Sequence, residues 1–130
     1  MQLLAMTACI ALLATGCGTG QKKLGKDSQT LVHNVYFTLI DASDEKKAEM
    51  INDCYTYLED HPGIVYFSAG TVSPEHSRPV NVKDFDVSLH MVFDSIAAHD
   101  AYQISEDHQT FIKRTKGNRK KLRVFDSLIK

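Results

Sequence analysis

The stretch DFDVSLHMVF, residues 84–93, alternates between apolar and polar side chains more clearly than any other part of the chain. Successive side chains of a β-strand point to opposite faces of a sheet, so this period of two predicts a strand. One face is expected to be apolar and to carry Phe85, Val87, Leu89, Met91 and Phe93. The other face is expected to be polar and to carry Asp84, Asp86, Ser88 and His90.

Three further segments have the composition of strands. Residues 31–40, LVHNVYFTLI, alternate in the same way, and residues 64–70, IVYFSAG, and 121–129, KLRVFDSLI, are short runs rich in β-branched and aromatic residues. In the first segment His33 falls on the apolar side, together with Leu31, Val35, Phe37 and Leu39. We therefore expect this histidine to face whatever covers the sheet.

Two segments between these strands have helical spacing. After the first strand, Asp41 and Ser43 are good N-cap residues, and Ala48, Ile51, Cys54 (or Tyr55) and Leu58 then recur at steps of three and four. His61-Pro62-Gly63 is expected to end this helix. A second helical region is expected from a cap at Asp94 or Ser95 to about Lys116, just before Gly117.

The order of these elements is β-α-β-β-α-β, which predicts one α+β domain over residues 31–130. With right-handed crossovers this order gives the ferredoxin-like arrangement, in which both helices cover the same face of an antiparallel sheet. The other face is too apolar to be left to water, because it mixes polar residues with Tyr36, Ile40, Val92, Phe125 and Ile129. A second copy of the chain is the simplest partner for it, so we expect a homodimer.

The first residues are of a different kind. Residues 1–16 carry no charge, and their apolar run, residues 3–14, is shorter than the roughly 20 residues that span a bilayer. Such a run is typical of the apolar core of an export signal. The sequence Ala-Thr-Gly-Cys that follows, residues 14–17, resembles the lipobox of bacterial lipoproteins, and the resemblance implies acylation of Cys17.

Residues 17–30 then read as a polar, flexible tether without apolar periodicity. The mature protein is accordingly expected in the bacterial cell envelope, held to a membrane by lipid on Cys17. The alternative is that residues 1–16 form an apolar helix buried in a soluble protein.

Charge, cysteines and histidines each narrow the range of functions that the sequence allows. A net charge of −1 gives no overall field to recruit nucleic acid. In the mature lipoprotein Cys54 would be alone, without a disulfide partner, and is expected to fill space in the core. The histidines His76, His90 and His99 stand at no spacing to carboxylates that indicates a metal site, so we expect neither a metal nor a cofactor.

Four stretches together resemble the stress-responsive α/β-barrel (Dabb) family: HNVYF at 33–37, FDVSLHMVFDS at 85–95, AYQISEDHQTF at 101–111 and KKLRVFD at 120–126. The resemblance covers about residues 31–129. It implies a homodimer in which two sheets close into a dimeric α/β barrel with the helices outside.

The resemblance also points to a site. One distant relative, the plant enzyme olivetolic acid cyclase, has a tyrosine and a histidine spaced as Tyr102 and His108 are here, and a histidine where His33 stands. A further histidine of that enzyme is replaced by Val87. The resemblance implies that His108 and Tyr102 are catalytic, and that both bind a ligand together with His33.

In one unbroken helix, six residues turn the chain by about 600°, which would leave Tyr102 and His108 roughly 120° apart. Ser105 is a good N-cap and acids follow it, so we expect a break that turns His108 back toward Tyr102. The three residues would then line a pocket for a small, largely apolar ligand. Two other hypotheses stay open: a cyclase or lyase that uses His108 and Tyr102 for proton transfer, and a non-catalytic structural stress protein in which His108 merely bridges the break.

Overall fold

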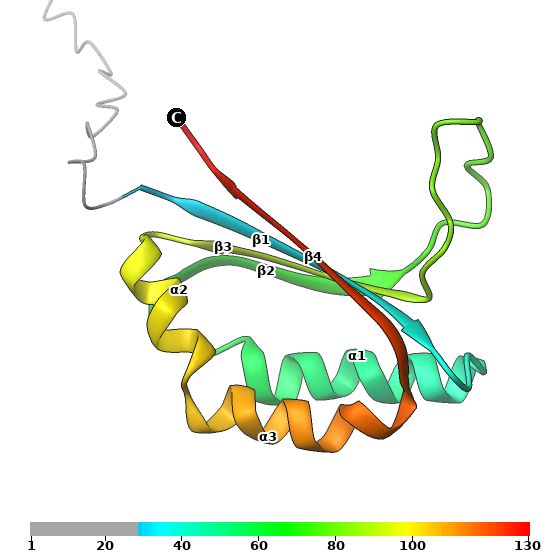
Figure 1. Ribbon diagram of the computed structural model, residues 1–130, viewed down its shortest axis with the longest axis horizontal. Coiled ribbons are helices and arrows are strands. Elements are labelled where there is room, and N and C mark those ends of the chain that lie inside the picture. The colour runs from blue at the N-terminus through cyan, green and yellow to red at the C-terminus, as the bar shows by residue number, and fades with distance from the viewer. Residues whose placement is uncertain (1–28) are drawn as a thin grey trace, which may run out of the picture.

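The protein is described by a computed structural model, which covers residues 29–130. The expected signal at 1–16, most of the expected tether at 17–30, and Cys17 lie outside the described residues. A four-stranded antiparallel sheet is covered on one face by helices, so the α+β ferredoxin-like prediction is confirmed (Figure 1). The elements are β1 (Leu31–Leu39), α1 (Asp44–Leu58), β2 (Ile64–Thr71), β3 (Val87–Phe93), α2 (Ile96–Gln103), α3 (Glu106–Thr115), the short 3-10 helix η1 (Lys116–Asn118) and β4 (Arg119–Leu128).

The strands lie in the order β2-β3-β1-β4, with β1 in the middle of the sheet. The register pairs His33 of β1 with Met91 of β3 and with Asp126 of β4. Residues that pair directly across antiparallel strands point to the same face, so Asp126 joins His33 on the helix side of the sheet. The fold therefore brings the imidazole of the first strand next to the carboxylate of the last strand.

The core lies between the sheet and the helices, as the alternation predicts. Every second residue of β1, from Leu31 to Leu39, is buried. The same holds for Val87, Leu89, Met91 and Phe93 of β3. From α1 they meet Met50, Cys54 and Leu58.

One prediction for this region is wrong: Phe85 does not share the buried face of β3. It lies before the strand begins, and its ring packs edge-on against Tyr36 of the opposite face, with 4.9 Å between ring centroids. The physical reason is Asp86, whose backbone N–H donates to the Phe37 carbonyl and whose carboxylate accepts from the Leu39 N–H at 2.7 Å. These bonds end the regular pairing between β1 and β3, so the alternation at residues 84–86 no longer tells which face of the sheet a side chain occupies.

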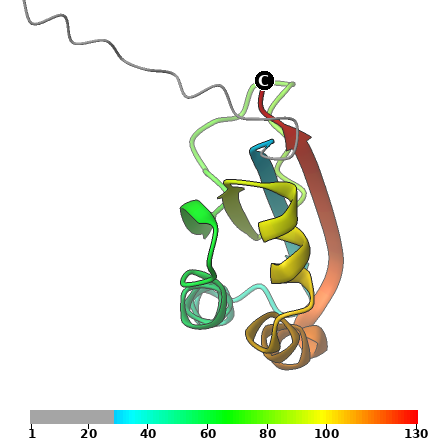
Figure 2. The same ribbon diagram turned by 90° about the vertical axis from the view of Figure 1, so that its left-hand side faces the viewer.

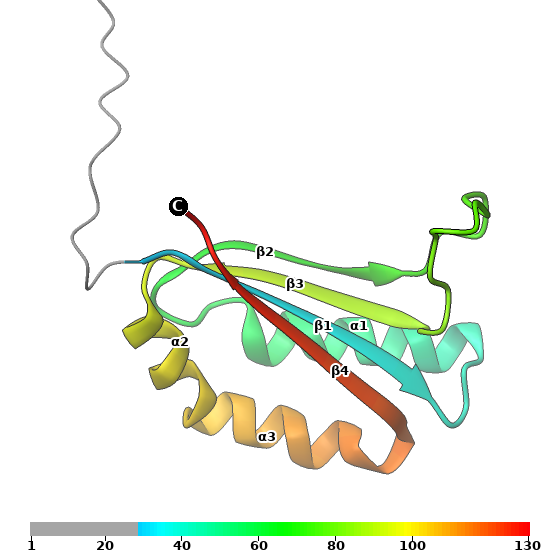
Figure 3. The same cartoon turned by 45° about the horizontal axis from the view of Figure 1, so that its top comes forward.

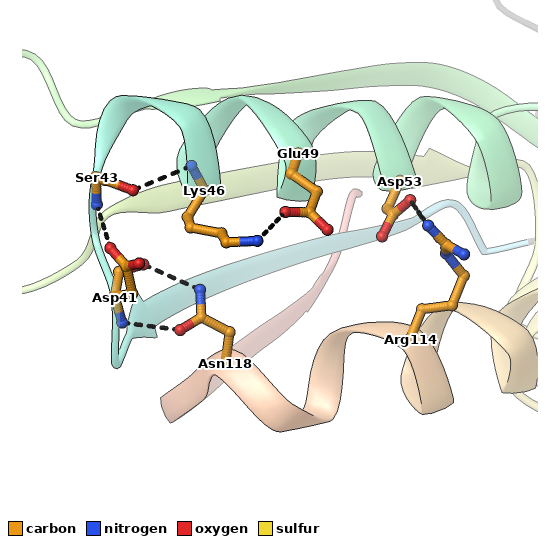
Figure 4. A network of polar contacts seen from close by, with 7 residues as sticks. All are labelled: Asp41, Ser43, Lys46, Glu49, Asp53, Arg114 and Asn118. Carbon is orange, nitrogen blue, oxygen red and sulfur yellow. Dashed lines mark hydrogen bonds and ion pairs between the residues drawn. The ribbon is translucent and has the colours of Figure 1, made fainter.

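Helix α1 is fixed at both ends to the rest of the domain (Figure 4). Ser43 caps it by accepting from the Lys46 N–H, as expected. Just before the cap, the backbone N–H and C=O of Asp41 both bond the side-chain amide of Asn118, at 2.8 and 2.9 Å. Near the other end, the buried carboxylate of Asp53 accepts two bonds from the Arg114 guanidinium of α3. Helices α1 and α3 therefore lie side by side, as the end-on view of Figure 2 shows.

Helix α1 ends earlier than expected, at Leu58, and Gly63 lies in the turn before β2 with a positive φ of 88°. A side chain here would also be blocked, because an added Cβ would lie 2.4 Å from the Cβ of Ala98. The Gly63 carbonyl accepts from the Asp94 N–H at 2.8 Å. The close approach permitted by this glycine holds the first turn of α2 against the start of β2.

The face of the sheet away from the helices carries Tyr36, Val92 and Phe125, as predicted. Ile40 and Ile129 lie just beyond the ends of their strands and are exposed. We call this surface the open face. The loop between β2 and β3 extends away from the sheet on this side, at the end opposite α2 (Figures 1 and 3). Within residues 29–130, no helix has the length and apolar content needed to cross a membrane.

Candidate functional site: a pocket lined by histidines

The expected break in the second helical region is present at Ser105. Its hydroxyl donates to the Tyr102 carbonyl at 2.8 Å, which closes α2, and accepts from the His108 N–H at 3.3 Å, which caps α3. One side chain thus ends one helix and begins the next. The turn brings the ring of His108 to 4.4 Å from the ring of Tyr102, measured between centroids.

Tyr102, His108 and His33 line one pocket of about 230 Å³ between β1, β4 and the two helices α2 and α3. The sequence-based expectation that the three side chains share a cavity is met by this geometry. Most of the wall is apolar. It is formed by Val35, Phe37, Leu89, Phe111, Ile112 and Val124, among others.

The imidazole of His108 is held in a defined tautomer. Its Nδ1 lies 3.0 Å from the Gln103 carbonyl, which can only accept, so Nδ1 carries the hydrogen and Nε2 keeps its lone pair. Burial lowers the pKa of His108 below its ordinary value, and the bond to Gln103 opposes that shift only in part. At neutral pH the ring is therefore an uncharged base with one available nitrogen.

Tyr102 lies at the centre of the site and is only 2% exposed. Burial raises the pKa of its phenol well above the ordinary value, so the group remains protonated. Within residues 29–130 its hydroxyl makes no hydrogen bond. A protonated phenol without a protein acceptor is a donor that a ligand can use.

His33 is tied to Asp126. The two side chains meet at 2.6 Å, Nδ1 to Oδ1, with the ring buried and the carboxylate half-exposed. Burial lowers the pKa of His33, while the hydrogen bond and the charge of Asp126 act in the opposite direction. The carboxylate fixes the orientation of the ring, because the protonated Nδ1 of the neutral imidazole donates to it.

Four histidines surround the Tyr102 ring, and the sequence argument identified two of them. His61, from the turn after α1, lies 5.6 Å from the ring of Tyr102, and His99 of α2 lies 6.5 Å away. His61 comes from outside any regular element, so no periodicity could place it. His99 stands three residues before Tyr102, a spacing that puts both side chains on neighbouring parts of one helix face and could have been used.

Two further polar residues of the pocket were missed. Asp126 neighbours Phe125, which was assigned to the open face, so the period of two already places the carboxylate on the helix side. Arg119 lies at the start of β4, where it lines the pocket and donates to the Ile112 carbonyl at 3.2 Å. Burial lowers the pKa of its guanidinium without removing the charge. No periodic signal identifies a residue at such a junction.

The group His33, His99 and Asp126 is the one cluster within residues 29–130 that could hold a metal ion. One ligand atom from each side chain lies within 4.8 Å of the others. Spacing along the chain could not reveal this cluster, because the three residues come from β1, α2 and β4.

Cys54 takes no part in the site. It is fully buried, and burial raises the pKa of its thiol to about 12, which agrees with a role in core packing.

A second, larger depression of about 370 Å³ lies on the open face. It is lined by Tyr36, Val82, Phe85, Arg123 and Phe125. It holds no imidazole and no carboxylate, and its one charged residue, Arg123, is paired with Asp84. The chemistry of the molecule is therefore concentrated in the pocket on the helix side.

An antiparallel ferredoxin-like sheet, covered on one face by helices and open on the other, with a histidine-lined pocket beside its edge strand, defines an α+β protein of the ferredoxin-like class. Within that class the chain belongs to the Dabb family, the stress responsive A/B barrel domain, whose profile matches residues 31–129. Among curated proteins, no sequence matches the chain.

Solved structures share the fold. A Dabb family protein from Mesorhizobium loti is 24% identical, with a TM-score of 0.64 over 78% of this chain and 98% of that one. A dimeric ferredoxin-like protein of unknown function from Thermobifida fusca is 14% identical, with a TM-score of 0.64 over 82% and 96%. The hydroxynitrile lyase of Passiflora edulis is 19% identical, with a TM-score of 0.63 over 79% and 95%. The same fold therefore occurs in proteins with and without an assigned activity.

Proposed function

We propose that the protein binds a small, largely apolar molecule in the pocket between the sheet and helices α2 and α3. The observation that carries this proposal is the pocket itself: an apolar wall with His33, Tyr102, His108 and Arg119 at separate points. Ligand sites are typically apolar cavities with a few polar groups that fix orientation. A lone structural histidine would not need such a cavity beside it.

The pocket also limits the size of the ligand. Its volume of about 230 Å³ is below the roughly 300–1,000 Å³ of sites for drug-sized molecules. The polar groups favour a molecule with one carbonyl, enolate or carboxylate oxygen, because the Tyr102 hydroxyl and the Arg119 guanidinium are both donors. The rest of the molecule is expected to be hydrocarbon.

Native mass spectrometry of the purified protein tests this proposal by detecting a small molecule that co-purifies with it. His108→Ala should weaken retention of that molecule at least about tenfold. His90→Ala is the matched control, because His90 is a half-buried histidine bonded to Asn34 on the open face. Equal retention by both variants, or no ligand in any preparation, would favour the non-catalytic structural protein.

A second candidate is proton transfer on the bound molecule, by a cyclase- or lyase-type reaction. The observation that favours it is the pairing of an uncharged imidazole with a protonated phenol at 4.4 Å. His108 Nε2 would take a proton from a carbon next to a carbonyl, and the C–H electrons would move onto the carbonyl oxygen as an enolate. Tyr102 would donate a hydrogen bond to that oxygen, and His108 would return the proton to the product. The likeness of fold to a hydroxynitrile lyase supports catalysis on such a scaffold.

Deuterium exchange separates binding from chemistry. The co-purified molecule, or a small methyl ketone as probe, is incubated with the protein in heavy water and analysed by mass spectrometry. Proton transfer predicts enzyme-dependent deuterium at the carbon next to the carbonyl. It also predicts loss of exchange in His108→Ala and a marked decrease in Tyr102→Phe. Binding without exchange would leave the first proposal standing and remove the second.

We also propose that two copies pair through their open faces, as a dimeric α/β barrel. The support is the apolar content of that face, where Phe125 is 53% exposed in the single chain, together with a relative of this fold that is described as dimeric. The depression around Tyr36 and Phe85 would then be covered by the partner. The pocket on the helix side would stay open to solvent.

Finally, we propose that the chain is exported and held at a bacterial membrane by lipid on Cys17. The support is the lipobox-like sequence at 14–17 and the uncharged apolar run before it. Cys17→Ser should abolish acylation, and mass spectrometry of the wild type should find lipid on that cysteine. Wild-type protein that carries no lipid, with a variant that still fractionates with membranes, would contradict the anchor.

A further inference from the structure

Three side chains that could bind a metal ion lie beside the pocket. We infer that His33, His99 and Asp126 form a binding site for a divalent transition-metal ion of the zinc type. The site does not depend on the proposed ligand, because His99 does not line the pocket and no step of the proposed reaction uses a metal. It also departs from the sequence-based expectation, which found no metal site.

The ligand set fits such an ion. Two imidazoles and one carboxylate are the donors of many catalytic zinc sites, which hold the metal through three side chains and leave one position for water or substrate. Here the three donors come from a central strand, a helix and an edge strand. Because the donors come from three different elements, they can approach an ion from three directions, which side chains of one helix or strand could not do.

The distances are close to those of a site. The three ligand atoms lie within 4.8 Å of one another, whereas ligands of a tetrahedral zinc ion, bound at about 2.0–2.2 Å, are roughly 3.3 Å apart. Closing that difference needs a modest turn of two side chains. His99 is bonded only to its own neighbours on α2, Asp100 at 3.3 Å and Gln103 at 3.0 Å, and Asp126 is half-exposed. Asp126 can move at the surface, whereas the His99 ring has to keep its packing against Phe93, 5.3 Å away between centroids.

The third donor is already in place. His33 is buried and its ring is fixed by Asp126 at 2.6 Å and by the edge of Phe93, 6.4 Å away between centroids. For both side chains to bind the ion, the hydrogen that His33 Nδ1 now shares with Asp126 would be released, because metal ligands must be deprotonated. Geometry alone therefore places a carboxylate in contact with the buried His33 ring and a second imidazole 5.1 Å from it, between centroids.

The position of the cluster gives it a consequence. His33 and Asp126 both line the pocket, so an ion on them would border the ligand cavity. An open coordination position at that place would accept a carbonyl or carboxylate oxygen from a bound molecule. The metal would then select oxygen-bearing ligands more strongly than Tyr102 and Arg119 do alone.

Zinc itself is the probe for the test. The full chain, freed of metal by a chelator and dialysed, is titrated with Zn²⁺ by isothermal calorimetry near neutral pH. One equivalent is expected to bind, and His99→Gln and Asp126→Asn should each weaken binding by about 100-fold or more. His90→Gln and His76→Gln, which change histidines outside the cluster, should leave binding unaltered.

Melting curves show whether a variant loses zinc binding because it is less stable or because it lacks a ligand. Without metal, His99→Gln should lower the melting temperature only slightly, because the hydrogen bonds of His99 are local and Gln keeps part of the packing against Phe93. With excess Zn²⁺ the wild-type melting temperature should rise, and that of His99→Gln should not. Absence of stoichiometric binding to the wild type would overturn the inference, and so would unaltered affinity in both His99→Gln and Asp126→Asn.

Discussion

The rings of Tyr102 and His108 lie 4.4 Å apart although the two residues belong to different helices. The contact exists because Ser105 ends α2 and starts α3 with the same hydroxyl. A phenol that stays protonated and an imidazole that stays neutral are thereby placed against one another in an apolar cavity. The geometry of the site depends on a helix break more than on either helix.

Ser105→Ala should therefore disturb the site as well as the stability. Loss of this N-cap should lower the free energy of unfolding by about 1–2 kcal/mol. The His108 ring should become less buried, so its pKa, followed by NMR titration, should rise toward about 6.5. Ser43→Ala is the control: it removes the N-cap of α1 and should cost about 1 kcal/mol without changing the His108 pKa. An unchanged His108 pKa in Ser105→Ala would contradict the role of the break.

His108→Ala should lower stability by no more than about 1 kcal/mol. The ring bonds the Gln103 carbonyl at 3.0 Å, but that carbonyl also accepts from the Gln109 side chain at 3.0 Å. Removing the imidazole therefore leaves no acceptor stranded. Chemical denaturation measures the difference, and a loss of about 3 kcal/mol would show that His108 is needed for the fold.

Stability should decrease as the pH falls below about 6.5. The pKa of His108 is lowered in the folded state by burial, and charges on His99, Arg119 and His61 add to this, while the bond to Gln103 opposes it. Between that lowered value and the ordinary value of about 6.5, the unfolded chain binds more protons, so acid favours unfolding. Denaturant titrations between pH 5 and 7.5 should show the decrease. His108→Gln should flatten the curve, and an equally steep curve in that variant would contradict the assignment.

Phe125→Asp should separate the proposed dimer. Its ring lies 5.7 Å from the ring of Tyr36 on the open face, where a second copy would bury the new carboxylate without a partner. Light scattering should find the dimer mass in the wild type and the monomer mass in the variant. Ile104→Asp changes an equally apolar residue, 82% exposed on the helix side, and should leave the dimer intact. A dimer that persists in Phe125→Asp would mean that the open faces do not pair.

Arg114→Ala should destabilise the fold by about 1–3 kcal/mol, because it leaves the buried Asp53 carboxylate without its two hydrogen bonds. Lys46→Ala removes an ion pair on the surface, with Glu49, and should change the free energy of unfolding much less, because water already solvates both groups. Urea denaturation of both variants gives the comparison (Figure 4). Equal effects would contradict the importance of burial for this ion pair.

Much of the fold could be predicted because its signals are local. The alternation in β1 and β3 reports burial directly, since one face of each strand meets the helices and the other does not. The break at Ser105 was readable because a capping serine followed by two acids is the chemistry of a helix start. Phe85 was misplaced because Asp86 diverts the backbone, and that bond joins residues far apart in the chain.

The site was predictable only in part. His33, Tyr102 and His108 were found through strand alternation, helix capping and the family resemblance. The turn that brings His61 to Tyr102 and the junction that carries Arg119 have no periodic signal. The pairing of His33 with Asp126 depends on the register between β1 and β4, the first and last strands, which a sequence read along its length does not fix.

The half-exposed inner face of β4 has a consequence for how this protein can change. Leu122 and Val124 line the pocket yet are each 45% exposed, while the tight core beneath α1 is built from other residues. Substitutions on this strand can therefore reshape the cavity at little cost in stability. The scaffold separates the residues that hold it together from those that select its ligand, which leaves it free to acquire new specificities by mutation of a single edge strand.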